Sequence, residues 1–129
     1  MKSYFIDTNY FLRLLLKDNE AQFQKVYTLF EQAINEQVKI YTSVIVFFEI
    51  YWVLSSFYKR NKSSCVHHLQ NILKMNFLDV ENREILQEAC TIFGKSSLDL
   101  EDSYNIAFFN QYKLNYFATF DKNVLKLVK

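Results

Sequence analysis

Residues 4–9 read YFIDTN, a short apolar run that stops at an aspartate. Such a run followed by Asp7, Thr8 and Asn9 is typical of a buried strand that ends in a loop. Residues 116–121 read YFATFD and show the same pattern near the other end of the chain. Both segments therefore predict a strand whose carboxyl end delivers an acidic side chain.

Between these ends, short strand candidates alternate with helical patterns. Two more strands are predicted at residues 38–41 and 77–80. Helices are predicted at residues 11–16, 19–36, 44–58, 64–74, 82–94, 99–112 and 123–128. The alternation favours the α/β class, as a three-layer α/β/α fold with a short central parallel sheet and helices on both faces. No linker or repeat interrupts the pattern, so residues 1–129 are predicted to form a single domain.

Several residues are predicted to begin or end these helices. Asp18 or Asn19 can cap the second helix, Ser43 the third and Asn82 the fifth. Gly94 is expected to end the fifth helix in the left-handed conformation. The helix at residues 44–58 is apolar on nearly every side and is therefore expected to be largely buried.

Composition limits the classes of function. The chain has 15 Lys and Arg against 14 Asp and Glu, so nucleic-acid binding would have to come from a local patch. Cys65 and Cys90 lack metal-ligand spacing and are interpreted as buried or semi-buried thiols of a reducing cytosol. No signal-peptide pattern is found, and the most apolar stretch, residues 44–54, is broken by Glu49 and too short to span a bilayer. The protein is therefore expected to be cytoplasmic.

The acidic residues carry the chemistry, although each has an alternative structural role. Asp7 can form a turn, and Asp99 and Asp121 can each cap a helix. Glu49 lies in a helix with almost no polar side, so it is expected to be buried beside a basic partner or a cation. Asp102 lies three residues after Asp99 and shares its helix face, where it would also favour the helix dipole.

Taken together, these residues favour a metal site. Carboxylates brought to one sheet edge would repel one another and raise their own pKa values. Mg²⁺ or Mn²⁺ relieves that repulsion and prefers oxygen ligands. Such an ion can activate water and neutralise charge on a phosphoryl group.

Four segments, in order, resemble the motifs of the PIN-domain family, and in particular its VapC-type toxin ribonucleases. Residues 5–9 resemble the first motif, and Glu49 is similar to the second acidic position. Residues 98–107 resemble the third motif, with Ser103 where alanine is usual. Residues 116–123 match the fourth motif closely. The resemblance implies a metal-dependent endoribonuclease, typically the toxin of a type II toxin–antitoxin pair, with an antitoxin protein as partner and a homodimer as its usual assembly.

The resemblance also assigns roles by position. The catalytic metal ligands would be Asp7, Glu49, Asp102 and Asp121. Asn9 would orient Asp7, Asp99 would supply an additional acid, and the hydroxyl of Thr119 would line the site.

Two basic groups are candidates for contact with RNA phosphates, although a solvated surface explains each as well. The groups are Lys59, Arg60 and Lys62, and Lys122, Lys126 and Lys129.

Two other functions remain open. A phosphatase or phosphotransfer domain would also place acids and Mg²⁺ at strand ends. A phosphatase with an aspartate nucleophile, however, requires a second aspartate two residues after the first, and Asn9 occupies that position. A catalytically silent binding module on the same fold is the other alternative. The sequence does not specify which RNA would be cut.

Overall fold

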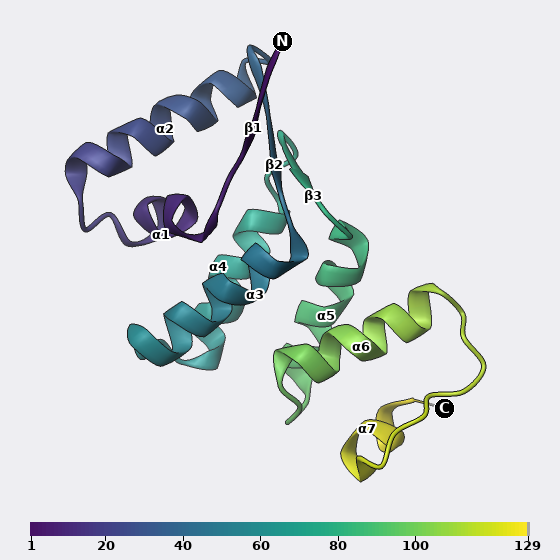
Figure 1. Cartoon of the computed structure of the whole chain (residues 1–129). Coiled ribbons are helices and arrows are strands. Elements are labelled where there is room, and N and C mark those ends of the chain that lie inside the picture. The colour runs from purple at the N-terminus through teal and green to yellow at the C-terminus, as the bar shows by residue number, and fades with distance from the viewer. Residues whose placement is uncertain (129) are drawn as a thin grey trace. The chain divides into compact units, whose positions relative to one another are not determined.

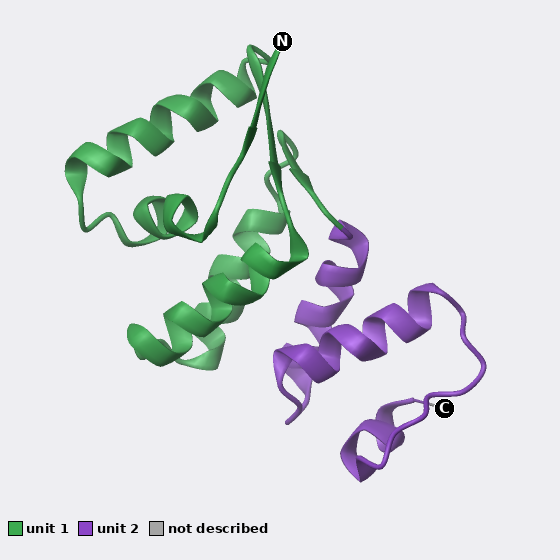
Figure 2. Cartoon of the chain, viewed as in Figure 1, with its two compact units in different colours: residues 1–81 green, residues 82–129 purple. Residues whose placement is uncertain are grey.

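The computed structural model describes residues 1–128 and divides the chain into two compact units, Met1–Glu81 and Asn82–Lys129 (Figure 2). Over the described residues there are one three-stranded parallel sheet, seven α-helices and one π-helical turn (Figure 1). This composition confirms the predicted α/β class of the three-layer α/β/α type. No helix in this part of the chain is long and apolar enough to cross a membrane.

The sheet lies entirely in the first unit. Its strands are β1 (Lys2–Phe5), β2 (Val38–Thr42) and β3 (Leu78–Val80), and their order in the sheet is β1-β2-β3. Tyr4 is paired with Ile40, and Ile40 with Leu78. Both pairings are parallel, so the carboxyl ends of all three strands lie at the same edge. The strands predicted in this unit are confirmed within about two residues.

Four α-helices and the π-helical turn complete the first unit. They are α1 (Thr8–Leu16), α2 (Glu20–Ile34), α3 (Val44–Trp52), η1 (Val53–Phe57) and α4 (Lys62–Leu73). Helix α1 contacts α2 and α3, α2 contacts β2, and α3 contacts α4. Asn19 and Ser43 cap α2 and α3, because each side chain accepts a hydrogen bond from a backbone N–H three residues later. The predicted cap at Ser43 is confirmed, and Asn19 is the cap of α2.

The helix predicted at residues 44–58 is less buried than expected. It changes to the π-helical turn at Val53, and only one stripe of it is buried, comprising Val46, Phe47, Ile50 and Leu54. Ile45 is 72% exposed. The expectation that this helix is largely buried was wrong, because a helix buries only the faces that have neighbouring elements, however apolar the others are.

Three helices form the second unit: α5 (Arg83–Lys95), α6 (Leu100–Gln111) and α7 (Lys122–Leu127). Ile85 and Ala89 of α5 pack with Ala107 of α6, while Leu98, Ile106 and Val124 form a second buried cluster. The Glu88 carboxylate also accepts hydrogen bonds from the side-chain amides of Asn110 and Gln111. Helices α5 and α6 are thus joined by apolar packing and by polar contacts.

Two predicted helix signals in this unit were wrong. Asn82 precedes α5 in a left-handed conformation with φ of 53°, and its side chain makes no capping bond. Instead, its amide donates to the Tyr104 hydroxyl at 3.1 Å. Gly94 lies inside α5, which continues to Lys95. Asn and Gly both favour helix ends. Here the Asn82 side chain bonds to Tyr104 instead of capping α5, and Gly94 is accommodated within the helix.

The strand predicted at residues 116–120 was also wrong, because the segment is not paired with the described sheet. Tyr116 is 91% exposed, while Phe117 packs against the cluster of Leu98, Ile106 and Val124. The ring centroid of Phe117 lies 5.3 Å from that of Phe109. A side chain rather than a backbone ladder therefore holds this segment in its unit, and Asp121 does not follow a strand.

Both cysteines are free and buried, as predicted. Burial raises the pKa of the Cys90 thiol to about 12, and it also raises the pKa of Cys65. Because only the thiolate is reactive, we expect neither cysteine of the folded protein to react with iodoacetamide at pH 8 within minutes. Both should react once the protein is unfolded in guanidinium chloride. Mass spectrometry counts the labels, and rapid labelling of Cys90 in the native protein would contradict its burial.

Candidate metal site

The first unit places Asp7 at the carboxyl edge of its sheet. Asp7 follows β1 and Ile6, and its Oδ1 accepts a hydrogen bond from the Tyr10 N–H at 3.2 Å as the cap of α1. Asp7 thus has a structural role as a helix cap, where the sequence had suggested a turn. This role does not exclude metal binding, because a carboxylate has two oxygens and an exposed side chain can offer the second one.

Glu49 is connected to the same edge through Thr8. The buried Thr8 hydroxyl donates to Glu49 Oε1 at 3.2 Å, which joins the first turn of α1 to α3. Glu49 itself is exposed, so the expectation of a buried carboxylate was wrong. Water solvates an exposed carboxylate, so Glu49 needs no basic partner to compensate for burial. Its oriented side chain is also accessible to a dissolved ion.

Two further contacts hold this edge together, and the sequence did not point to either. The Thr42 hydroxyl at the end of β2 donates to the Ile6 carbonyl at 2.8 Å. Glu81, directly after β3, accepts the Val44 N–H with Oε1 at 3.0 Å and so supports the start of α3. Glu81 could have been suspected because an acid follows each of two parallel strands. Thr8 and Thr42 offered no sequence signal, since their partners are distant along the chain.

The second unit gathers the other predicted acids. Asp99 caps α6, with its Oδ1 accepting the Asp102 N–H at 2.7 Å. The buried Ser103 hydroxyl donates to the Asp99 carbonyl at 2.8 Å, so serine has a bonding role at this position. Asp121 caps α7 and accepts the N–H groups of Asn123 and Val124. The capping roles proposed for Asp99 and Asp121 are therefore both present.

Thr119 acts on the loop before α7. Its Oγ1 accepts the Asp121 N–H at 3.0 Å, which fixes the backbone of the residue that carries the carboxylate. The Thr119 hydroxyl thus stabilises the turn that carries Asp121.

The electrostatics of the second unit centre on Asp102. Its pKa is raised above the ordinary value, first by burial and then by the charges of Asp99 and Asp121, with a hydrogen bond to Asp99 and the charge of Glu101 adding to the effect. Each of these influences disfavours the ionised carboxylate. A cation near Asp102 would relieve the repulsion, and the oxygen donors suit a hard ion such as Mg²⁺.

The side chains are of the type that binds such an ion, but they do not form a complete ligand set. Within residues 1–128, no three His, Cys, Asp or Glu side chains are gathered closely enough to form a complete ligand set. Asp7 and Glu49 are joined through Thr8 in the first unit, and Asp99, Asp102 and Asp121 interact in the second. Both sets consist of carboxylates, the ligand type that a hard divalent cation prefers.

The predicted basic residues lie on exposed segments. Lys59, Arg60 and Lys62 occupy the connection from η1 to α4 and its first turn, and Lys122 begins α7. Burial, followed by the positive charges of Arg60 and His67, lowers the pKa of His68. Lys129 lies outside the described residues.

The comparisons with known proteins agree with this description. A family model described as "PIN domain" matches residues 4–129, almost the whole chain. No curated protein and no solved structure matches. The order of the acidic residues along the chain, the parallel sheet and the match to the family model lead to one assignment. The chain belongs to the PIN domain family.

Proposed function

We propose that this protein is a metal-dependent endoribonuclease. The observation that supports it most directly is the group of acids in the second unit, in which burial and then the charges of Asp99 and Asp121 raise the pKa of Asp102. A cluster that disfavours its own charge is suited to a divalent cation, and PIN domains are generally nucleases.

In this proposal Asp7, Glu49, Asp102 and Asp121 hold Mg²⁺ or Mn²⁺. The bound ion would supply an activated water and neutralise charge on the phosphoryl group. The protein's own contribution is orientation. Thr8 holds the Glu49 carboxylate, and Thr119 holds the turn that carries Asp121. Asp99 adds negative charge, and Asn9 is proposed to orient Asp7.

The test is cleavage of total RNA by the purified protein with Mg²⁺ or Mn²⁺, with and without a chelator. We expect cleavage that the chelator stops and that added metal restores, with products carrying a 5′-phosphate and a 3′-hydroxyl. A folded protein, free of bound inhibitor, that cuts no RNA with either metal would support the silent binding module instead. Release of phosphate from a small phosphomonoester, without RNA cleavage, would support the phosphatase alternative.

The biological setting is part of the same proposal. We propose a VapC-type toxin that forms a homodimer and binds a cognate antitoxin protein. Expression in a bacterial host should arrest growth if RNA is the target, and the Asp102→Asn variant should not arrest it. Growth unaffected by an active nuclease would argue against the toxin role while leaving the enzymatic activity in place.

The contact between Thr8 and Glu49 yields a separate prediction. Thr8→Val removes the donor and keeps the side-chain shape, and we expect it to lower cleavage by about 10-fold, since loss of a group that orients a metal ligand costs roughly 10- to 100-fold. Thr8→Ser should retain most of the activity. The Mg²⁺ concentration needed for half-maximal activity should rise for Thr8→Val only. Equal metal dependence of both variants would show that Glu49 does not rely on this bond.

A further inference from the structure

A surface pocket with a mixed polar and apolar lining lies next to Asp7 in the first unit. It has a volume of about 290 Å³ and is formed by side chains of α1, of its N-cap Asp7 and of α2. Its lining includes Asp7, Asn9, Tyr10, Arg13, Gln22 and Lys25. Among the described residues that line it, Asp7 is the acidic one and two are basic. The pocket therefore brings two cationic and two amide side chains next to a predicted metal ligand.

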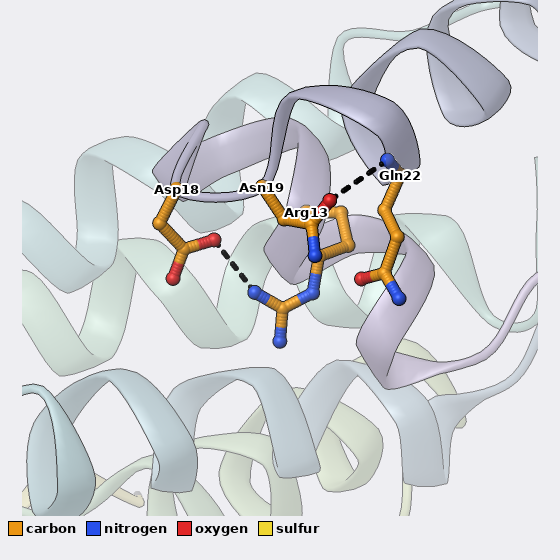
Figure 3. A network of polar contacts seen from close by, with 4 residues as sticks. All are labelled: Arg13, Asp18, Asn19 and Gln22. Atoms are coloured by element: carbon orange, nitrogen blue, oxygen red, sulfur yellow. Dashed lines mark hydrogen bonds and ion pairs between the residues drawn. The ribbon is translucent and has the colours of Figure 1, made fainter.

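Arg13 is held in a defined position at this pocket. Its Nη1 donates to Asp18 Oδ1 at 2.6 Å in an ion pair. Figure 3 shows the guanidinium between Asp18 on one side and the Gln22 side chain on the other. The start of α2 is fixed as well, because Asn19 Oδ1 accepts the Gln22 N–H at 3.0 Å. A guanidinium has five N–H donors, and Arg13 uses some of them for Asp18 and for the Tyr58 side chain. Its remaining donors can bind an anion.

A neighbouring hollow extends the pocket along the surface. It has a volume of about 410 Å³ and shares Tyr10 and Lys25 with the first, and it is also lined by Tyr4 and Gln24. Tyr4 and Tyr10 are 38% and 39% exposed. Partly exposed aromatic rings alternating with cations and amides are typical of surfaces that bind single-stranded nucleic acid. This extension favours a nucleic-acid chain over a small free anion.

We propose that Arg13 and Lys25 form a subsite for a backbone phosphate of the RNA, close to the phosphate that is cleaved. The proposal rests on the proposed ribonuclease function and names the residues that position its substrate. Lys25 and the remaining N–H donors of Arg13, which is already paired with Asp18, would donate to the phosphate oxygens. The Asn9 and Gln22 amides would donate as well. Asp18 acts indirectly by fixing the direction of the guanidinium.

The test compares Arg13→Gln, Lys25→Gln and the double variant with Lys74→Gln. Lys74 is an exposed residue that directly follows α4 as its C-cap and lines neither hollow, so it is the matched control. Binding of a labelled single-stranded RNA is measured by fluorescence anisotropy over a range of salt concentrations. An Asp102→Asn background keeps the RNA uncut. Cleavage by proteins with the native Asp102 is measured in parallel.

We expect the double variant to bind RNA about 10-fold more weakly and to lose about 0.7 from the slope of log affinity against log salt for each phosphate contact removed. Cleavage should show a raised KM with a smaller change in kcat. Thermal unfolding verifies that Arg13→Gln is folded, and Lys25→Gln, at an exposed position, gives an independent measurement. Unchanged affinity and slope in Lys25→Gln and the double variant would overturn the subsite even if the protein cuts RNA. RNA binding that weakens as expected in a protein that never cuts would support the subsite and refute the nuclease.

Discussion

Asp102→Asn is expected to lower metal-dependent RNA cleavage by about 100-fold or more. The loss of a residue that only orients a metal ligand costs roughly 10- to 100-fold, and a direct ligand should lie at or above the top of that range. Initial rates at saturating Mg²⁺ measure the effect. Glu84→Gln is the matched control, because Glu84 is also an acid in the first turn of a helix of the second unit, and it should leave the rate unchanged.

The same substitution should not destabilise the metal-free protein. The pKa of Asp102 is raised in the folded state, so its contribution to stability is present below the ordinary value of 3.8 and is lost as the pH rises through the raised value. At neutral pH the ionised group is therefore unfavourable, and the neutral asparagine relieves it. Thermal unfolding at pH 7 in chelator should give a Tm for Asp102→Asn that is no lower than that of the wild type.

Adding Mg²⁺ completes this test. The ion should raise the Tm of the wild type, since it binds the folded state, and it should raise that of Asp102→Asn much less. Wild-type activity in Asp102→Asn, or an equal Mg²⁺ shift in both proteins, would remove Asp102 from the metal site. A large loss of Tm in chelator would instead show that Asp102 stabilises the fold.

Ile50→Ala is expected to have the largest effect on stability, while Ile45→Ala on the same helix should have almost none. Ile50 is 1% exposed and Ile45 is 72% exposed. Removing a buried isoleucine side chain costs about 2–5 kcal/mol, since burial is lost and a cavity remains. Exposed substitutions usually stay within about 0.5 kcal/mol. Urea unfolding followed by circular dichroism measures both free energies of unfolding.

This pair of variants tests the burial pattern of α3, which carries Glu49. Equal costs for Ile45→Ala and Ile50→Ala would mean that Ile45 is covered in solution, for example by a second copy of the chain. In that case the cost of Ile45→Ala should depend on protein concentration, because an interface between copies is stabilised by mass action. A cost that is independent of concentration would contradict that explanation.

Local signals in the sequence were sufficient for most of the fold. Apolar periodicity located every helix, and the capping residues Asn19 and Ser43 were identified because a cap needs only a side-chain oxygen and a backbone N–H three residues away. The acids before helices were recognised in the same way. Asp99 and Asp121 were considered both as caps and as metal ligands, and the structure confirms the capping part of that interpretation.

Most failures of the sequence analysis involve partners that are distant along the chain. Residues 116–120 have the composition of a strand, but a strand also needs a neighbour, and the packing of Phe117 holds this segment instead. Asn82 has the residue type of a cap, yet Tyr104 takes its amide. Glu49 was expected to be buried because its helix is apolar, and only the arrangement of the neighbouring elements determined that it is exposed.

The same distinction between local sequence signals and distant partners applies to the candidate site. The sequence by itself determined the family, the parallel α/β class and the identities of the acidic residues, because those depend on residue types and their order. Only the tertiary structure decided that Thr8 orients Glu49, that Asp99 and Asp121 disfavour the charge on Asp102, and that Arg13 faces a pocket beside Asp7. Hydrogen bonds and charge repulsion act over a few ångströms in space, whereas sequence patterns record neighbours along the chain.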